Sequence, residues 1–274
     1  MGPKISIITV SFNAVNTIEQ TITSVLNQTY NNYEYIIIDG ESTDGTVDII
    51  KKYEDKITCW ISEQDNGIYD AMNKGIAHAN GDYIQIIGAD DCFCNDESLT
   101  SIVSQLSNDI DILSACEYVI VDGNRQFKYS NAFAKNKDNY RGGMVPHAAM
   151  LVKKSIYNKY KFDESYKIVA DYKFFLQCYY DDDIKIKFVS DYIVFFDGSG
   201  VSSDSVACRQ EDERVYRELK LSFNKKTKPK KYKQLIRSLF MNIGIYKYIY
   251  NQYLNFFVYE KHRCDNKICR WCRR

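Results

Sequence analysis

The chain has 274 residues, of which 45% are apolar and 26% are charged, and its 36 basic side chains balance its 36 acidic ones. This length can bury a proper core, and with only 13 glycines and 3 prolines the composition excludes collagen-like and proline-rich disordered classes. No apolar run approaches the roughly 18 residues of a membrane-spanning helix. Met1 to Ile8 enter a strand-like pattern directly, so we expect no secretory signal, and the nine scattered cysteines favour reduced thiols in the cytoplasm.

The balanced charge conceals an asymmetry between the two ends of the chain. From Lys220 onward there are 15 basic and 2 acidic residues, so the preceding residues hold 21 basic and 34 acidic ones. An acidic body and a basic tail need separate explanations.

The first 91 residues alternate between strand and helix patterns. Apolar runs predict strands at 5–10, 35–38, 58–62 and 83–87, and apolar residues at helical spacing predict helices at 15–28, 46–53 and 67–79. Asn13 is expected to cap the first helix. Strands joined through helices need crossover connections, so the sheet should be largely parallel, as in nucleotide-binding α/β proteins.

The alternation ends after about residue 108. We expect a strand at 110–115, a hairpin of 118–121 and 125–129 around Asp122-Gly123, strands at 148–152 and 186–196, and helices at 170–180 and 204–223. The predicted organisation is one domain over 1–220, divided into halves at 1–108 and 109–220, followed by a helical extension over 221–274.

The extension contains an apolar and aromatic stripe at helical spacing between Tyr232 and Phe257, flanked by basic and amide side chains. Such a helix can lie on an anionic membrane surface, and the predicted contact covers residues 231–274. Alternatively the stripe packs on the body or on a second copy. The helical spacing argues against a nucleic-acid surface. His262, Cys264, Cys269 and Cys272 offer a weak zinc pattern, and spare thiols are the simpler interpretation.

Carboxylates stand where the predicted strands end: Asp39, Asp65, Asp90 and Asp91. In open parallel sheets, ligands bind beyond the carboxyl ends of the strands. Negative charge at that edge suits a phosphate ligand only if a divalent cation lies between them. The chain has neither a Gly-x-x-x-x-Gly-Lys loop nor a Gly-x-Gly-x-x-Gly turn, so the pattern favours a nucleotide diphosphate bridged by Mn²⁺ or Mg²⁺.

Four blocks, KISIITVSFN (4–13), YIIIDGESTDGT (35–46), DNGIYDAMNKG (65–75) and GDYIQIIGADD (81–91), resemble family 2 glycosyltransferases in order and spacing. Ala170-Asp171 resembles the later acidic motif of that family. Segments around 145–147, 161–165 and 198–202 are similar to bacterial enzymes of polysaccharide assembly. The resemblance implies a GT-A fold: a Rossmann-like, mostly parallel sheet with helices on both faces.

The resemblance also implies roles for particular residues. An aromatic at Phe12 would cover the base, Asp91 would hold the metal, and Asp171 would be the catalytic base. His147 is a possible contact for the acceptor or a phosphate. Residues implied in donor binding are Val10, Phe12, Asp39, Asp65, Asn73 and Asp90. Ala89 stands where the family's acidic motif has its first carboxylate, so fewer protein ligands reach the metal.

The expected reaction is inverting transfer of a hexosyl or N-acetylhexosaminyl group from a nucleotide-diphosphate donor, by resemblance a UDP-sugar, to a saccharide or lipid-linked acceptor. The setting implied is bacterial surface polysaccharide synthesis, in the cytoplasm or on the inner face of the membrane. Of two alternative functions, the first stays open and the second is disfavoured. The chain could bind nucleotide sugars without turnover, because Ala89 has replaced a carboxylate. A nucleotidyltransferase is disfavoured, because residues 9–13 contain no glycine and no cation.

Overall fold

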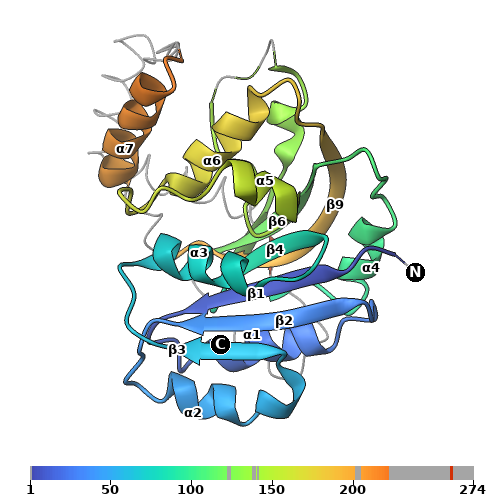
Figure 1. Cartoon of the computed structure of the whole chain (residues 1–274), viewed down its shortest axis with the longest axis vertical. Coiled ribbons are helices and arrows are strands. Elements are labelled where there is room, and N and C mark those ends of the chain that lie inside the picture. The colour runs from blue at the N-terminus through green and yellow to red at the C-terminus, as the bar shows by residue number, and fades with distance from the viewer. Residues whose placement is uncertain are drawn as a thin grey trace.

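The computed structural model describes residues 2–121, 125–137, 140, 142–200, 205–221 and 260–261. These residues form one mixed ten-stranded sheet with helices on both faces (Figure 1). The strands are β1 (Ile5–Ser11), β2 (Tyr33–Asp39), β3 (Cys59–Ser62), β4 (Tyr83–Gly88), β5 (Cys92–Phe93), β6 (Ile112–Val121), β7 (Arg125–Tyr129), β8 (Met150–Lys153), β9 (Ile186–Asp197) and β10 (Glu260–Lys261).

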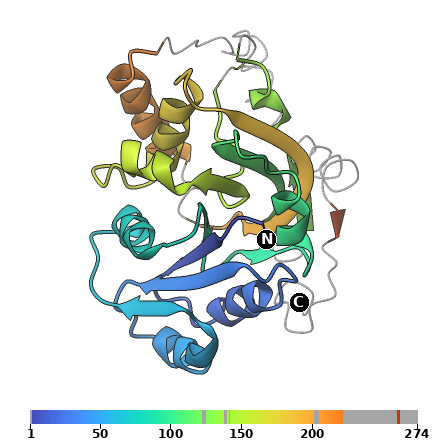
Figure 2. The same cartoon turned by 45° about the vertical axis from the view of Figure 1, so that its right-hand side comes forward.

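The helices separate into two layers (Figures 1 and 2). The α-helices are α1 (Ile18–Leu26), α2 (Thr46–Lys51), α3 (Ile68–His78), α4 (Ser98–Val103), α5 (Lys154–Lys159), α6 (Ala170–Tyr179) and α7 (Ser205–Glu218), with 3₁₀ turns at Glu54–Lys56 and Asn131–Ala134. Apolar residues of α1, α2 and α4 pack in one core on one face of the sheet, and those of α3, α5 and α6 pack in a second core on the other. None of these described helices is long and apolar enough to cross a bilayer.

The amino-terminal half is the parallel part of the sheet, as predicted. Its strands run in the order β4-β1-β2-β3, and β8, β6 and β7 extend the sheet in antiparallel fashion beyond β4. The register places Ser11 beside Asp39, and Asp39 beside Ser62. Three carboxyl ends therefore meet at one edge, where the sequence predicts the ligand.

The second half differs from the prediction at one strand and at α5, a short helix that was not expected. The expected strand over 110–115 and the first strand of the hairpin form a single strand, β6, which pairs with β7 as predicted. The pairing of β6 with β9 shifts register on both sides of Cys116. The Asn131 side chain fills this irregularity, because its amide donates to the carbonyls of Ser114, at 2.6 Å, and Val189, at 3.0 Å. A buried amide thus satisfies backbone groups that the ladder leaves unpaired.

The predicted cap at Asn13 is wrong. The first helix begins at Ile18, and Asn13 has a positive φ of 49°. Its side chain accepts a hydrogen bond from the Thr43 N–H at 3.1 Å, and its N–H donates to the Ser42 hydroxyl at 2.8 Å. Asn tolerates the left-handed region, so Asn13 fastens the turn after β1 to the turn after β2.

Part of the tail can be placed. Glu260 and Lys261 form β10, which pairs antiparallel with β7 at the edge of the sheet (Figure 2). The turn at Asp122-Gly123, the predicted amphipathic helix and the His262–Cys272 cluster lie outside the described residues. The chain beyond residue 221 thus returns to the body at least at β10.

Candidate active site

Asp39, the last residue of β2, is wholly buried between the ends of β1 and β3. Its Oδ1 accepts hydrogen bonds from the Ser11 and Ser42 hydroxyls at 2.8 and 2.6 Å. Its Oδ2 accepts from the Ser62 hydroxyl at 2.7 Å and from the Ser42 N–H at 2.9 Å. Four donors match the acceptor capacity of a carboxylate. Asp39 therefore ties three strand ends together, and its contact with a donor stays a prediction.

An exposed aromatic ring lies beside this anchor. Phe12 follows β1 and is 67% exposed, although it is large and apolar. A Cβ at Gly40 would come within 2.5 Å of Asp65 Oδ2 and 3.3 Å of Phe12 Cδ2, so the ring and the carboxylate flank the bare glycine backbone. Asp65 is held by the Gly67 N–H at 2.8 Å. A flat exposed ring beside a fixed carboxylate suits a planar base attached to a hydroxylated sugar.

Val10 lies beneath this surface. Its side chain is buried in the core shared with α3, and its carbonyl accepts the Ala89 N–H at 3.1 Å. Both groups are used by the fold, so a donor contact at Val10 stays a prediction.

Asp90 and Asp91 follow β4 at the same edge of the sheet. Asp91 is only 4% exposed, and it accepts the N–H groups of Gly88 at 3.0 Å and Asp197 at 3.1 Å. Asp90 is half-buried. A Cβ at Gly88 would come within 2.5 Å of Asp90 Oδ1 and 3.1 Å of Asp91 Oδ2, so the two carboxylates crowd the strand end. Burial, reinforced by the charges of Asp90 and Glu117, raises the pKa of Asp91 well above its ordinary value.

These residues fit a divalent cation bound together with a substrate. Oxygen ligands suit Mg²⁺ and Mn²⁺, which are often held by one or two carboxylates plus substrate phosphates. The crowded negative charge at Asp90 and Asp91 is what such a cation would relieve. Within the described part of the chain, no three His, Cys, Asp or Glu side chains form a metal cluster. A diphosphate would therefore have to complete the coordination.

Asp171 lies in the first turn of α6 and is half-buried. The Tyr69 hydroxyl, from α3, lies 3.0 Å from Asp171 Oδ1 and 2.5 Å from the Ile168 carbonyl. Burial, with the Asp171 charge beside it, raises the pKa of Tyr69 far above neutral, so this phenol stays a donor. Glu211 of α7 accepts the N–H groups of residues 167, 168 and 169 at 2.8 to 3.1 Å and so caps the start of α6.

Glu117, in the middle of β6, is a site residue that sequence reasoning missed. It is 4% exposed, and its Oε2 has no hydrogen-bond partner among the described residues. Burial, with the Asp171 charge added, raises the pKa of Glu117 to about 8. The Glu117 charge in turn contributes to the raised pKa of Asp91. Glu117 thus lies near enough to Asp171 to be affected by its charge and near enough to Asp91 to affect that carboxyl, and the roles of Asp91 and Asp171 stay predictions.

Two further titratable groups lie near Asp171. Burial lowers the pKa of His147 while the Asp171 charge opposes the shift, and the imidazole meets Phe162 edge-on at 6.0 Å. Partial burial and the charges of Asp171 and Glu211 raise the pKa of Asp212, on α7, to about 6. The sequence singled out His147 but not Asp212, which lies in a charge-rich helix pattern. The predicted contact of His147 with acceptor or phosphate is not tested by this geometry.

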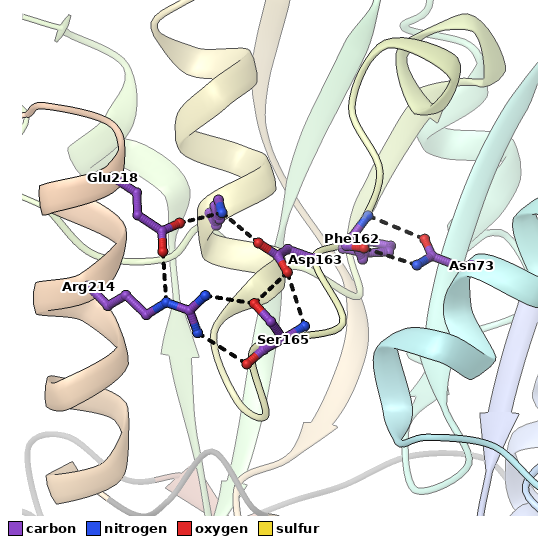
Figure 3. Close-up of polar contacts among 7 residues, drawn as sticks. Asn73, Phe162, Asp163, Ser165, Arg214 and Glu218 are labelled. Atoms are coloured by element: carbon purple, nitrogen blue, oxygen red, sulfur yellow. Dashed lines mark hydrogen bonds and ion pairs between the residues drawn. The ribbon is translucent and has the colours of Figure 1, made fainter.

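Asn73 has a role that the sequence did not predict. Its Nδ2 donates to the Phe162 carbonyl at 3.0 Å and its Oδ1 accepts the Phe162 N–H at 3.3 Å (Figure 3). Its Nδ2 also donates to Glu164 Oε1 at 2.9 Å. The 162–165 loop is tied to α7 as well, because Arg214 donates to the Ser165 carbonyl at 3.1 Å and hydroxyl at 2.7 Å. Asn73 thus joins the two halves, and its contact with a donor stays a prediction.

Residues 6–170 match the family model described as glycosyl transferase family 2. An uncharacterized glycosyltransferase of Mycobacterium tuberculosis is 32% identical over 180 residues, which cover 64% of this chain and 69% of that protein. TuaG of Bacillus subtilis, named for teichuronic acid biosynthesis, is 40% identical over 98 residues, or 35% of this chain and 39% of TuaG.

Solved structures share the fold at low sequence identity. The structure of S. aureus TarS in complex with UDP-GlcNAc has a TM-score of 0.60 at 19% identity, covering 74% of this chain and 61% of that one. A mannosyltransferase of Pyrobaculum calidifontis, solved with GDP-Man and Mn²⁺, has a TM-score of 0.62 at 14% identity, covering 80% of this chain and 64% of that one. The GT-A fold expected from the sequence is confirmed, and this chain spans about two thirds or less of these structures.

The raised pKa of Glu117 makes a prediction about stability. The folded protein holds this proton up to a pH of about 8, above the ordinary glutamate value of 4.5. The stability contributed by the proton is therefore full below pH 4.5 and lost as the pH rises through 8. Glu117→Gln stays neutral, so its stability relative to the wild type should improve by up to about 4 kcal/mol between pH 5 and pH 9. Denaturant unfolding with a chelator present measures this difference.

Glu213→Gln is the matched control, because Glu213 is exposed on α7. Its stability difference from the wild type should be the same at both pH values. An equally pH-independent difference for Glu117→Gln would contradict the burial of a protonated acid in β6.

Proposed function

The chain belongs to glycosyltransferase family 2, and we propose that it is an inverting transferase that uses a UDP-sugar. It transfers a hexosyl or N-acetylhexosaminyl group to a saccharide or lipid-linked acceptor during assembly of a bacterial surface polysaccharide. The name of TuaG and the UDP-GlcNAc bound to TarS support the pathway class and the donor class. The Mn²⁺ in the mannosyltransferase complex supports a divalent cation.

One observation carries the proposal: Glu117 is electrostatically coupled both to Asp91, at the end of β4, and to Asp171, on α6. Residues 80 positions apart in the chain are thus both coupled to one buried acid. This supports the proposal, because an inverting transferase needs a leaving-group site and a base that serve opposite faces of the transferred carbon.

At the donor side, the Phe12 ring would cover the base, and Asp39 and Asp65 would lie near the uracil and ribose. Asp90 would face the ribose, and Asp91 would hold the cation. A divalent cation bound there would neutralise charge on the departing diphosphate. The network around Asp39 holds the strand ends in place before the donor arrives, so little ordering is needed on binding.

At the acceptor side, Asp171 would take the proton of the attacking hydroxyl. Tyr69 holds Oδ1, which leaves Oδ2 to accept that proton. The new bond joins the acceptor oxygen to the anomeric carbon, the bond from that carbon to the phosphate oxygen breaks, and the nucleoside diphosphate leaves with the bonding electrons. The configuration at the anomeric carbon inverts.

A second candidate function is nucleotide-sugar binding without turnover. Two observations favour it: Ala89 replaces a carboxylate, and both oxygens of Asp91 already accept backbone N–H groups. A panel of UDP-glucose, UDP-galactose, UDP-GlcNAc and GDP-mannose, each with MnCl₂ or MgCl₂, separates the two functions. Nucleotide release indicates transfer or hydrolysis. Saturable binding with no release in any pairing would favour the binding protein.

Asp91→Asn tests the metal. We expect donor cleavage to fall by about 100-fold or more, because the neutral amide can no longer anchor a cation against the diphosphate. Asp96→Asn, an exposed carboxylate in the same segment, should retain activity. Cleavage rates at increasing MnCl₂ concentration make the measurement. Full metal-dependent activity in Asp91→Asn would remove this residue from the metal site.

Asp171→Asn tests the base. The transfer rate should fall by about 1,000-fold while UDP affinity stays unchanged, since the variant removes a proton acceptor and leaves the nucleoside pocket intact. Asp182→Asn is the control, because that side chain is 97% exposed. Calorimetric titration with UDP and a single-turnover transfer assay give the two numbers. A parallel loss of UDP binding would assign Asp171 to the donor pocket instead.

We also propose that the basic tail contacts an anionic membrane surface, on the charge of its sequence. Replacing lysines 225, 226, 228, 230, 231 and 233 by glutamine keeps β10 and removes six charges. Flotation with phosphatidylglycerol vesicles should drop by about 10-fold or more, since each basic residue near such a surface contributes about 1 kcal/mol. Unchanged flotation would support packing of the tail on protein.

A further inference from the structure

Among the described residues, four buried side chains have an atom without a hydrogen-bond partner, and Glu117 is the one of them that is coupled to Asp91 and Asp171; the others are Gln85, Asn131 and Tyr166. Glu117 lies within β6, paired with Tyr129 of β7 on one side and Val194 of β9 on the other. Its Oε2 is buried without a hydrogen-bond partner among the described residues. A buried acceptor left unpaired loses the hydrogen bonds that water gave it in the unfolded chain, so a folded protein retains one mainly where another group completes it.

None of the described residues around Glu117 donates a hydrogen bond to its Oε2. Its cross-strand neighbour, Tyr129, donates its hydroxyl to the Met144 carbonyl at 2.6 Å. The charge that acts on the ionisation of Glu117 is that of the Asp171 carboxylate, which cannot donate while ionised. The sheet brings Glu117 near Asp91 as well, because the residues that follow them, Tyr118 and Cys92, both pair with Phe195 of β9. The missing partner is therefore a group supplied from outside the described chain.

The position of Glu117 is fixed by the strands around it. The irregular pairing of β6 with β9 begins at Ser114, and the wholly buried Asn131 amide holds the carbonyls of Ser114 and Val189. A side chain held at a supported irregularity of a central strand has little freedom to turn elsewhere. The strands around Glu117 therefore fix the position of its unpaired oxygen.

We propose that the Glu117 carboxyl binds a hydroxyl group of the transferred sugar and selects donors that carry it. This inference rests on the proposed transferase function. In that reaction the diphosphate lies at Asp91 and the acceptor hydroxyl at Asp171, so the sugar ring occupies the space between them, where Glu117 lies. A carboxylic acid offers one O–H donor and a carbonyl acceptor, which together match a sugar hydroxyl.

The chemistry of the pocket favours a sugar hydroxyl over a phosphate. The neighbouring carboxylates would repel a phosphate placed directly against Glu117, whereas a hydroxyl is neutral and can also donate to them. A site that buries a polar group for a substrate hydroxyl rejects an analogue lacking it strongly, because the protein group is then left unpaired again. Glu117 would therefore act on the choice of donor sugar.

The test combines variants of Glu117 with donor analogues that lack one sugar hydroxyl. The donor is whichever nucleotide sugar of the panel the wild type consumes, together with its 3-, 4- and 6-deoxy analogues. For the wild type, one analogue should lose about 100-fold or more in kcat/KM relative to the parent donor. For Glu117→Met, the parent donor should lose a similar factor and the same analogue should lose no more, because hydroxyl and carboxyl are then removed as one pair.

Three controls separate contact from folding. Glu117→Gln keeps a donor and an acceptor, so it should retain discrimination against the same analogue. The affinity for UDP, which has no sugar ring to contact Glu117, should be unchanged in both variants while the affinity for the sugar nucleotide weakens in Glu117→Met. Glu213→Gln, on the exposed side of α7, should behave as the wild type.

The outcomes are distinct. Undiminished discrimination in Glu117→Met, or full activity of that variant with the parent donor, would overturn the proposal while leaving the transferase function in place. Equal loss of UDP binding would make Glu117 structural. If the wild type consumes no nucleotide sugar, the transferase function itself fails. Should Glu117→Met not fold, Glu117→Asp decides, because it withdraws the carboxyl by one methylene: loss of discrimination against the same analogue with UDP affinity intact supports the contact, and unchanged discrimination with every analogue contradicts it.

Discussion

Asp91, Glu117 and Asp171 come from three separate parts of the chain, and the Asp171 charge acts on the ionisation of Glu117 as the Glu117 charge acts on that of Asp91. Concentrating negative charge in a partly buried region opposes folding unless the charge is protonated, hydrogen-bonded or met by a cation. In this protein the acidic side chains are nevertheless gathered at the edge of the sheet. A substrate that brings a cation and several hydroxyls would relieve each part of it, which is why the site is best understood together with its ligands.

Asp39 and Glu117 show two ways of burying an acid in the same sheet. Asp39 receives four hydrogen bonds, three of them from serine hydroxyls on adjacent strand ends and turns. Glu117 keeps an oxygen without a partner among the described residues, and its pKa rises to about 8. The first arrangement stabilises the scaffold by itself. The second is costly in the free protein and becomes favourable only when a further group arrives.

The sequence predicts the parallel half well because local signals and the global fold agree there. Apolar runs ending in Asp39 and in Asp90-Asp91 mark strands whose carboxyl ends must meet in a parallel sheet. Glu117 could not be found in this way, because a single charged residue in an apolar run indicates a break in the strand. It is covered by β7, the other strand of its hairpin, and it lies near β9 and α6, which are distant in sequence. Its one signal was a lone acid between two strand-like runs.

Two other polar residues show the same limit of sequence-based reasoning. Asn13 has the residue type of a helix cap, but the turn after β2 supplies a stronger partner for it than the helix does. Asn73 lies within a donor-type motif, yet its amide meets a loop 89 residues later in the chain. Polar side chains of this size bond to whichever backbone group tertiary packing brings near, and local pattern carries no information about that choice.

Helix α3 joins the two halves of the site through the spacing of its residues. Tyr69 and Asn73 are four positions apart and so lie on one face of the helix, where Tyr69 holds Asp171 and Asn73 holds the 162–165 loop. Another side of α3 packs on the sheet at Gly75. A Cβ at Gly75 would come within 2.5 Å of Ile8 Cγ2, so only glycine lets the helix lie this close to β1. Because β1 also ends at the edge proposed to bind the donor, one rigid helix sets the separation between that edge and Asp171. In the proposed function, a change that lifts α3 from the sheet should therefore move Asp171 relative to the donor edge without touching either, and would lower the transfer rate more than it lowers nucleotide affinity.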